Sequence, residues 1–313
     1  MTPISASLPF LDGAAFVTDG GIETTLVFLE GIDLPQFAAY TLLRTAEGRQ
    51  SLEDYFVGYA DLGRRHTVGI VLDTPTWRAS TDWGRVLGDD QAALDWANTQ
   101  AVALLLDVRA RYETPESPIV ISGAIGPRGD GYVAGEEMTA SAAAAYHGRQ
   151  ALQLGQAGVD VITALTMTNS NEAIGIADAA RAAAVACAVA FTVEVDGRLP
   201  NGETLGDAIS AVDAATSGSV AYFMINCAHP SHFEATIDVD EAWVRRLRGI
   251  RSNASMASHA ELNEADTLDP GDPVELGEHL WRLHDRHEHL TLLGGCCGTD
   301  ERHIDAIAGH IVG

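Results

Sequence analysis

Lysine is missing from the 313-residue sequence: all 19 basic residues are arginine, against 44 acidic residues. The formal net charge of −25 disfavours nucleic acid and anionic membrane surfaces as partners, because both repel a negatively charged protein. Without lysine, no lyase or aldolase mechanism that forms a lysine Schiff base is available.

Cysteine is also scarce. Four cysteines in a chain of this length do not make a disulfide framework, and a cytosolic enzyme uses such residues for metal binding or chemistry. No apolar run approaches the ~20 residues that span a bilayer, and the first nine residues lack the basic and apolar parts of a signal peptide. We therefore expect a cytoplasmic enzyme with no membrane partner.

Short apolar segments alternate with longer alanine-rich stretches along the whole chain. Eight segments are predicted as strands: 15–19, 69–73, 119–123, 159–165, 188–194, 220–226, 247–253 and 290–294. Eight helices are predicted between and after them: 42–64, 91–112, 141–157, 171–186, 204–215, 240–246, 273–287 and 299–311. This pattern predicts an α/β fold, a single (β/α)8 TIM barrel over residues 1–313. An open doubly wound sheet has the same alternation and is the alternative.

Polar residues fall at or just after the ends of the predicted strands. They are Asp19, Asp73, Gly123, Thr166, Glu194, Cys227, Asn253 and Cys296. In a barrel, these ends share one rim, where the active site assembles. The placement therefore favours the barrel over the open sheet.

The most specific motif is Gly-Gly-Cys-Cys-Gly at residues 294–298, directly after the last predicted strand. An isolated pair of cysteines is equally compatible with an inert, buried turn. A third cysteine, Cys227, however, ends another predicted strand. Three thiolates at one rim suit Zn²⁺, and a fourth, open position would make the site catalytic. We therefore predict that Cys227, Cys296 and Cys297 bind Zn²⁺ and carry the catalysis.

Two further segments carry candidate substrate-binding residues. Asp19, Gly20, Gly21 and Glu23 follow the first strand, where the glycine amides can hold an anion and the carboxylates can bind an ammonium or act as bases. Trp77 follows the second strand, and its ring face can stack on a sulfonium or quaternary ammonium. A plain glycine turn and a packed tryptophan are the structural alternatives.

Taken together, the Asp-Gly-Gly segment at 19–21, the loop 123–127, Asn226-Cys227 and the motif 294–299 resemble the homocysteine S-methyltransferase family over essentially the whole chain. The resemblance implies a (β/α)8 barrel with one catalytic Zn²⁺ held by the three cysteines named above. It also implies that Asp19 lies near the amino group of the acceptor and that the backbone at Gly20-Gly21 faces its carboxylate.

The sequence departs from the family pattern at three places. Leu165-Thr166 stands where the family typically has Glu-Thr, Trp77 replaces a usual tyrosine, and 251–256 reads Arg-Ser-Asn-Ala-Ser-Met in place of Pro-Asn-Ser-Gly. Thr166 and Asn226 are the remaining candidate substrate-binding residues. These departures predict retained metal chemistry with altered substrate recognition.

The resemblance implies a zinc-dependent methyltransferase. Such an enzyme moves a methyl group from a sulfonium donor (S-methylmethionine or S-adenosylmethionine) or an ammonium donor to a zinc-bound thiolate, with homocysteine giving methionine. Alternatives are the same chemistry on another thiol, a barrel lyase, or a non-catalytic zinc-binding relative. The expected partners are a small-molecule thiol acceptor and methyl donor, and the alanine-rich helices are compatible with a homodimer.

Overall fold

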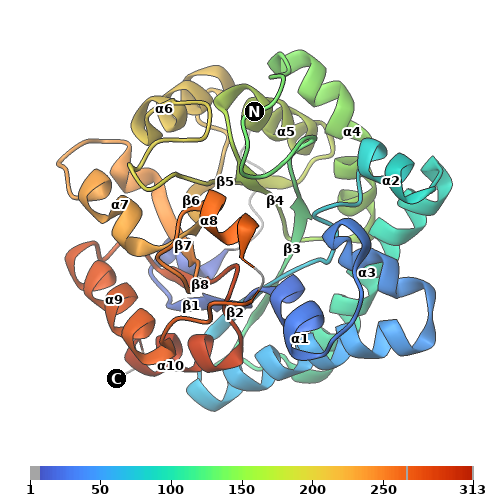
Figure 1. Ribbon diagram of the computed structural model, residues 1–313, viewed down its shortest axis with the longest axis horizontal. Coiled ribbons are helices and arrows are strands. Elements are labelled where there is room, and N and C mark those ends of the chain that lie inside the picture. Colours follow the sequence, from blue (N-terminus) through green and yellow to red (C-terminus); the bar gives the residue numbers. More distant parts are fainter. Residues whose placement is uncertain (1–7, 266, 312–313) are drawn as a thin grey trace.

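The computed structural model describes residues 8–265 and 267–311. Its parallel strands close into one barrel in the order β1 to β8, and helices surround the barrel on the outside (Figure 1). The strands are β1 (Phe16–Thr18), β2 (Gly69–Asp73), β3 (Ile119–Ile125), β4 (Val161–Met167), β5 (Ala186–Phe191), β6 (Tyr222–Ala228), β7 (Leu247–Ser252) and β8 (Leu292–Gly295). The predicted (β/α)8 TIM barrel is confirmed, and the open sheet is wrong because β1 pairs with both β2 and β8.

Residues 8–265 and 267–311 contain ten α-helices, nine between the strands and one after β8. They are α1 (Ala46–His66), α2 (Thr81–Leu87), α3 (Gln91–Tyr112), α4 (Ala140–Ala157), α5 (Ser170–Ala182), α6 (Leu205–Thr216), α7 (Pro230–Ile237), α8 (His259–Glu264), α9 (Pro273–Arg286) and α10 (Glu301–Ile311). Each of the long predicted helices matches one of these to within a few residues. Among the described residues, none of the helices combines the length and the hydropathy of a membrane span.

One predicted helix, 240–246, is wrong. The helix between β6 and β7 is α7, and residues Val244–Arg246 form only a 3-10 turn. The side chain of His229 accepts a hydrogen bond from the amide of Ser231, and Pro230 occupies the first turn of α7, so the helix begins immediately after β6. The prediction missed this start signal because the segment is short and its apolar periodicity is weak.

Apolar side chains fill the barrel on both sides of its wall. Inside the barrel, strand residues such as Phe16, Val71, Val161 and Tyr222 form one buried cluster, and a larger cluster lies between strands and helices. Alternation along each strand places every second side chain inside the barrel. Asp73, two residues beyond Val71, therefore faces the interior near its C-terminal rim.

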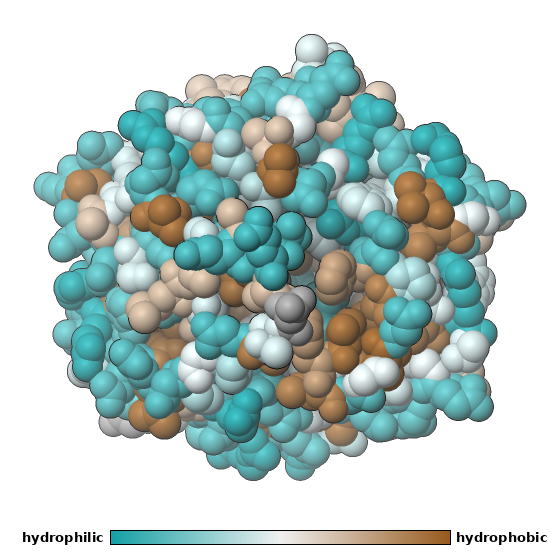
Figure 2. Space-filling model, viewed as in Figure 1, coloured by the Kyte–Doolittle hydropathy of each residue, from teal (hydrophilic) through white to brown (hydrophobic). Residues whose placement is uncertain are grey.

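The face viewed in Figure 2 is mostly hydrophilic, in keeping with the excess of acidic residues. Hydrophobic side chains gather to the right of its centre, over the region where Figure 1 shows the segment between β1 and α1. This segment contains the irregular helix η2 (Thr24–Leu29), whose Phe28 and Leu29 are about half exposed. The remaining connections on this side form the rim that carries the candidate site.

Candidate active site

Three thiols converge at the C-terminal rim of the barrel. Cys227 lies at the end of β6, and Cys296 and Cys297 directly follow β8. Their sulfur atoms all lie within 4.8 Å of one another, and no other group of metal-ligating side chains is as close in residues 8–265 and 267–311. The structure therefore brings together all three predicted ligands, while Cys187 is buried elsewhere in the core.

The backbone at the first of these cysteines is unusual. Cys227 has a φ of +54°, a left-handed conformation that is rare for residues with a Cβ atom. Its carbonyl oxygen accepts a hydrogen bond from His259 Nε2 at 2.6 Å, which helps to hold this turn. Thr166, at the end of β4, has a similar φ of +61° and is held by its neighbour Asn226. Both conformations persist because the surrounding contacts fix them.

The sulfur geometry fits a tetrahedral zinc site for one pair and requires movement of the other. Two sulfurs on one zinc ion lie ~3.8 Å apart, since Zn–S bonds are ~2.3 Å long. The Sγ atoms of Cys227 and Cys297 are 3.9 Å apart. Cys227 and Cys296 instead form a disulfide contact, with their Cα atoms 5.4 Å apart. The donor set therefore fits Zn²⁺ when this pair is reduced and its sulfurs separate.

The surroundings of Cys297 also suit a bound cation. Burial raises the pKa of the Cys297 thiol above its usual value, against an opposing hydrogen bond from Tyr132. A buried thiol of this kind stays protonated unless a positive charge stabilises its thiolate, as a divalent metal does.

Tyr132 is a site residue that the sequence analysis missed. Its hydroxyl lies 3.4 Å from Cys227 Sγ and 3.3 Å from Cys297 Sγ, and its ring packs against His259. It lies in the glycine-rich loop after β3. The sequence of such a loop does not show whether a single tyrosine points toward the site or toward solvent. Tyr132 therefore covers the thiols on one side.

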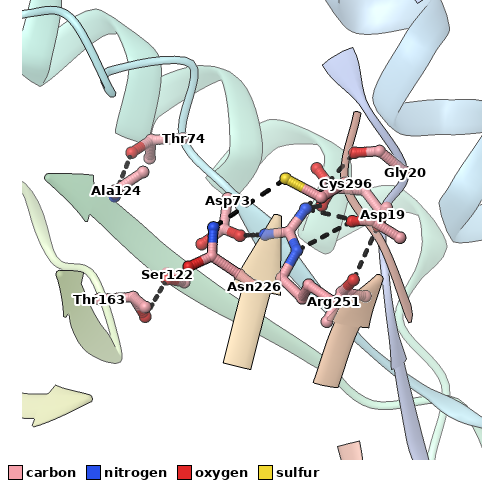
Figure 3. A network of polar contacts seen from close by, with 12 residues as sticks. Asp19, Gly20, Asp73, Thr74, Ser122, Ala124, Thr163, Asn226, Arg251 and Cys296 are labelled. Carbon is pink, nitrogen blue, oxygen red and sulfur yellow. Dashed lines mark hydrogen bonds and ion pairs between the residues drawn. The ribbon is translucent and has the colours of Figure 1, made fainter. Parts of the chain in front are cut away.

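An ion cluster lies beside Cys296, as Figure 3 shows. Arg251 on β7 donates from Nη2 to Asp19 Oδ1 at 2.6 Å and contacts Asp73 Oδ2 through Nη1. Its Nε donates to the carbonyl of Gly295, the residue before Cys296. All three charged side chains are at least nine-tenths buried. Asp19 lies where the sequence places it, but its partner in this structure is an arginine of the same chain.

Burial raises the pKa values of the two carboxyl groups that follow β1, Asp19 and Glu23. Burial raises the pKa of Asp19 to about 6, although the charge of Arg251 opposes this shift. Burial likewise raises the pKa of Glu23 to about 7, against a hydrogen bond from its own backbone and the charge of Arg78. In the described part of the chain, no side-chain hydrogen bond or ion pair engages the Glu23 carboxyl. Glu23 is therefore the less constrained of the two.

The paired glycines serve close packing. A Cβ atom at Gly20 would lie 2.6 Å from the Tyr59 hydroxyl, and one at Gly21 would lie 2.5 Å from the Cys296 carbonyl oxygen. The amide of Gly21 donates to the carbonyl and hydroxyl of Thr299. This amide is therefore engaged inside the protein, and the glycines allow the β1 and β8 turns to touch.

The family model described as homocysteine S-methyltransferase matches residues 16–311. The chain belongs to the homocysteine S-methyltransferase family. No curated protein matches this family member significantly in sequence.

Solved structures of the homocysteine methyltransferase MmuM from Escherichia coli resemble this family member in fold. The metallated form has a TM-score of 0.77 at 18% identity, covering 97% of this chain and 99% of MmuM. The oxidized form has a TM-score of 0.74 at 18% identity, covering 94% of this chain and 95% of MmuM. At this identity the likeness concerns the fold.

One departure from the family pattern, Leu165, has a visible structural consequence in this family member. Leu165 packs in the apolar cluster inside the barrel, so β4 offers no carboxylate there. Thr166 exchanges two hydrogen bonds of 2.9 Å with the side chain of Asn226, whose amide also reaches Cys296 Sγ at 4.0 Å. Both predicted substrate-binding residues thus contact each other.

Trp77 already stacks on a cation of the same chain. The guanidinium of Arg78 lies 3.8 Å from the centre of the Trp77 ring and 3.7 Å from that of Trp83. Arg78 also donates to the carbonyl of Gly129. This stack holds the loop after β2 against the loop that carries Tyr132. One face of the Trp77 ring is therefore covered by Arg78.

Proposed function

We propose that this family member is a zinc-dependent S-methyltransferase with homocysteine as acceptor and methionine as product. The methyl donor is a sulfonium such as S-methylmethionine or S-adenosylmethionine, or a quaternary ammonium. The observation that carries the proposal is the convergence of Cys227, Cys296 and Cys297 at one point of the rim, within 4.8 Å.

The chemistry divides between the metal and the chain. When bound, Zn²⁺ would hold the acceptor sulfur as a thiolate, which makes it nucleophilic at neutral pH. The three cysteines would hold the metal and leave one position for the acceptor. The methyl group leaves the donor as its bond to the sulfonium sulfur or ammonium nitrogen breaks, and a new carbon–sulfur bond forms to the acceptor thiolate. A sulfonium donor departs as a neutral thioether, and an ammonium donor departs as a tertiary amine.

The other residues of the site orient and enclose the reactants. Tyr132 covers the thiols and limits access of water from the side of its loop. Asn226 and Thr166 form the wall beside Cys296. Three reduced thiols need a reducing compartment, which supports a cytoplasmic location.

Metal analysis and a substrate screen test this function together. Protein purified under reducing conditions is expected to contain about one zinc per chain by atomic spectroscopy. It should then transfer a methyl group from one of the named donors to homocysteine, detected by mass spectrometry of the product. A chain that binds no zinc when fully reduced would contradict the proposal. If the methyl group is transferred only to a different thiol, that thiol replaces homocysteine as the acceptor.

A further inference from the structure

We infer that Asp73, on β2, is the residue that recognises the ammonium group of the acceptor. This inference rests on the proposed function, since it concerns the acceptor of that same site. The ammonium of a bound amino-acid thiol needs a carboxylate partner, because burying an unpaired charge costs several kcal/mol. The candidates beside the thiols are Asp19, Glu23 and Asp73. Glu23 is only partly buried and neither of its carboxyl oxygens is left buried without a partner, so the choice lies between the two aspartates.

Asp19 is already engaged inside the protein. Its Oδ1 accepts from Arg251 Nη2, and neither of its oxygens is left buried without a partner. Tyr55, which donates to the carbonyl of Gly20 at 2.9 Å, covers Asp19 on the side of α1. An ammonium at Asp19 would have to displace the guanidinium of a side chain that is only 6% exposed.

Asp73 differs in one respect that points to a ligand. Its Oδ2 contacts Arg251 Nη1, whereas its Oδ1 is buried and has no hydrogen-bond partner among residues 8–265 and 267–311. The residue is only 8% exposed. A buried carboxylate oxygen without a donor is costly, so a donor supplied by a ligand is favoured there.

The charge balance agrees with a cationic donor. Asp19 and Asp73 carry two negative charges, and Arg251 supplies one positive charge between them. An ammonium group at Asp73 Oδ1 would bring the net charge of this buried cluster to zero. A neutral donor such as a ligand hydroxyl would leave the net charge at −1. Leu165 lines the barrel interior and supplies no competing carboxylate from β4.

The structure also holds Asp73 in a fixed place near the thiols. Thr74, the next residue, donates its amide to the carbonyl of Ser122 and accepts the amide of Ala124 on its hydroxyl (Figure 3). Arg251 joins Asp73 to the carbonyl of Gly295, one residue before Cys296. In Figure 3 the side chains of Asp73, Asn226 and Arg251 lie close to Cys296.

A binding experiment tests the role of Asp73 without relying on methyl transfer. Co²⁺-loaded protein is titrated with homocysteine and with 4-mercaptobutanoate, the same thiol without its amino group, and sulfur ligation is followed by the cobalt absorption bands. The wild type is expected to bind homocysteine at least about 10-fold more tightly, because only homocysteine can pair with Asp73. Equal binding of the two thiols by the wild type would overturn the assignment, and this measurement needs no variant.

Substitution then locates the recognising group. Asp73→Asn should weaken homocysteine binding roughly 10- to 100-fold and change 4-mercaptobutanoate binding less than about 3-fold, the second thiol reporting that the site remains folded. The matched control Asp19→Asn should change both affinities by a similar factor, since Asp19 acts through Arg251. An equal loss for both thiols in Asp73→Asn, or selective loss in Asp19→Asn, overturns the assignment. If neither thiol perturbs the wild-type cobalt spectrum, the proposed function itself fails, and the assignment with it.

Discussion

Arg251 and Asp19, 232 positions apart in the sequence, join the two strands that flank β8: Arg251 Nη2 on β7 donates to Asp19 Oδ1 after β1 over 2.6 Å. Both side chains are almost fully buried. A buried guanidinium between two carboxylates stabilises the fold only while all partners are present, since loss of one leaves an uncompensated charge.

Replacing Arg251 by methionine is therefore expected to lower the free energy of unfolding by about 3–5 kcal/mol, because Asp19 and Asp73 would both remain buried without a cation. Urea denaturation followed by circular dichroism measures this. Arg245→Met, at an exposed arginine whose closest acidic group is 3.6 Å away, is the matched control and should change stability by less than about 0.5 kcal/mol. Equal stabilities of the two variants would contradict the structural role of Arg251.

Cys297→Ala is expected to reduce bound zinc well below one per chain and to abolish methyl transfer while the barrel remains folded, because two sulfurs do not complete the ligand set. Zinc content and circular dichroism spectra provide the measurement. Cys187→Ala is the control, since Cys187 is buried in the core away from the cluster and burial raises its pKa to about 12. It should keep its zinc and lose only about 1 kcal/mol of stability. Zinc loss in both variants would argue against a local ligand role.

Metal binding and the Cys227–Cys296 contact are expected to exclude each other, because a sulfur in a disulfide is not a thiolate ligand. Oxidised protein should take up no zinc and show two titratable thiols in denaturant, Cys187 and Cys297. Treatment with a reductant should restore four thiols and zinc uptake. Zinc binding by the fully oxidised chain would show that other residues hold the metal.

Glu23 is expected to make stability depend on pH. Burial raises the pKa of Glu23 from 4.5 to about 7, so the folded state binds its proton more tightly than the unfolded state does. Stability contributed by the neutral form is present at low pH and is lost as the pH rises through about 7. Metal-free Glu23→Gln should therefore exceed the wild type by roughly 2 kcal/mol at pH 8, with a smaller difference at pH 5.5. Urea titrations at both pH values measure the gap, and a pH-independent gap would refute the shift.

Much of the fold could be predicted because its signals are local. The eight apolar strand segments and the long helices repeat at regular intervals, and β2 and α3 begin and end at the predicted residues. The helix predicted at 240–246 failed because a proline start signal at Pro230 outweighs a weak periodic pattern.

Part of the candidate site was likewise predictable from local sequence signals, and part was not. The amino-acid sequence is enough to predict that the three cysteines end two strands of a barrel and meet at one rim, because parallel strands place their carboxyl ends on the same side. It did not determine that Arg251 would pair with Asp19, 232 positions away, or that Tyr132 would point at the sulfurs. These partners follow from the closure of the barrel, which brings distant strands and loops together. Burial then favours pairing of each charge and hydroxyl, since an unpaired buried polar group is costly.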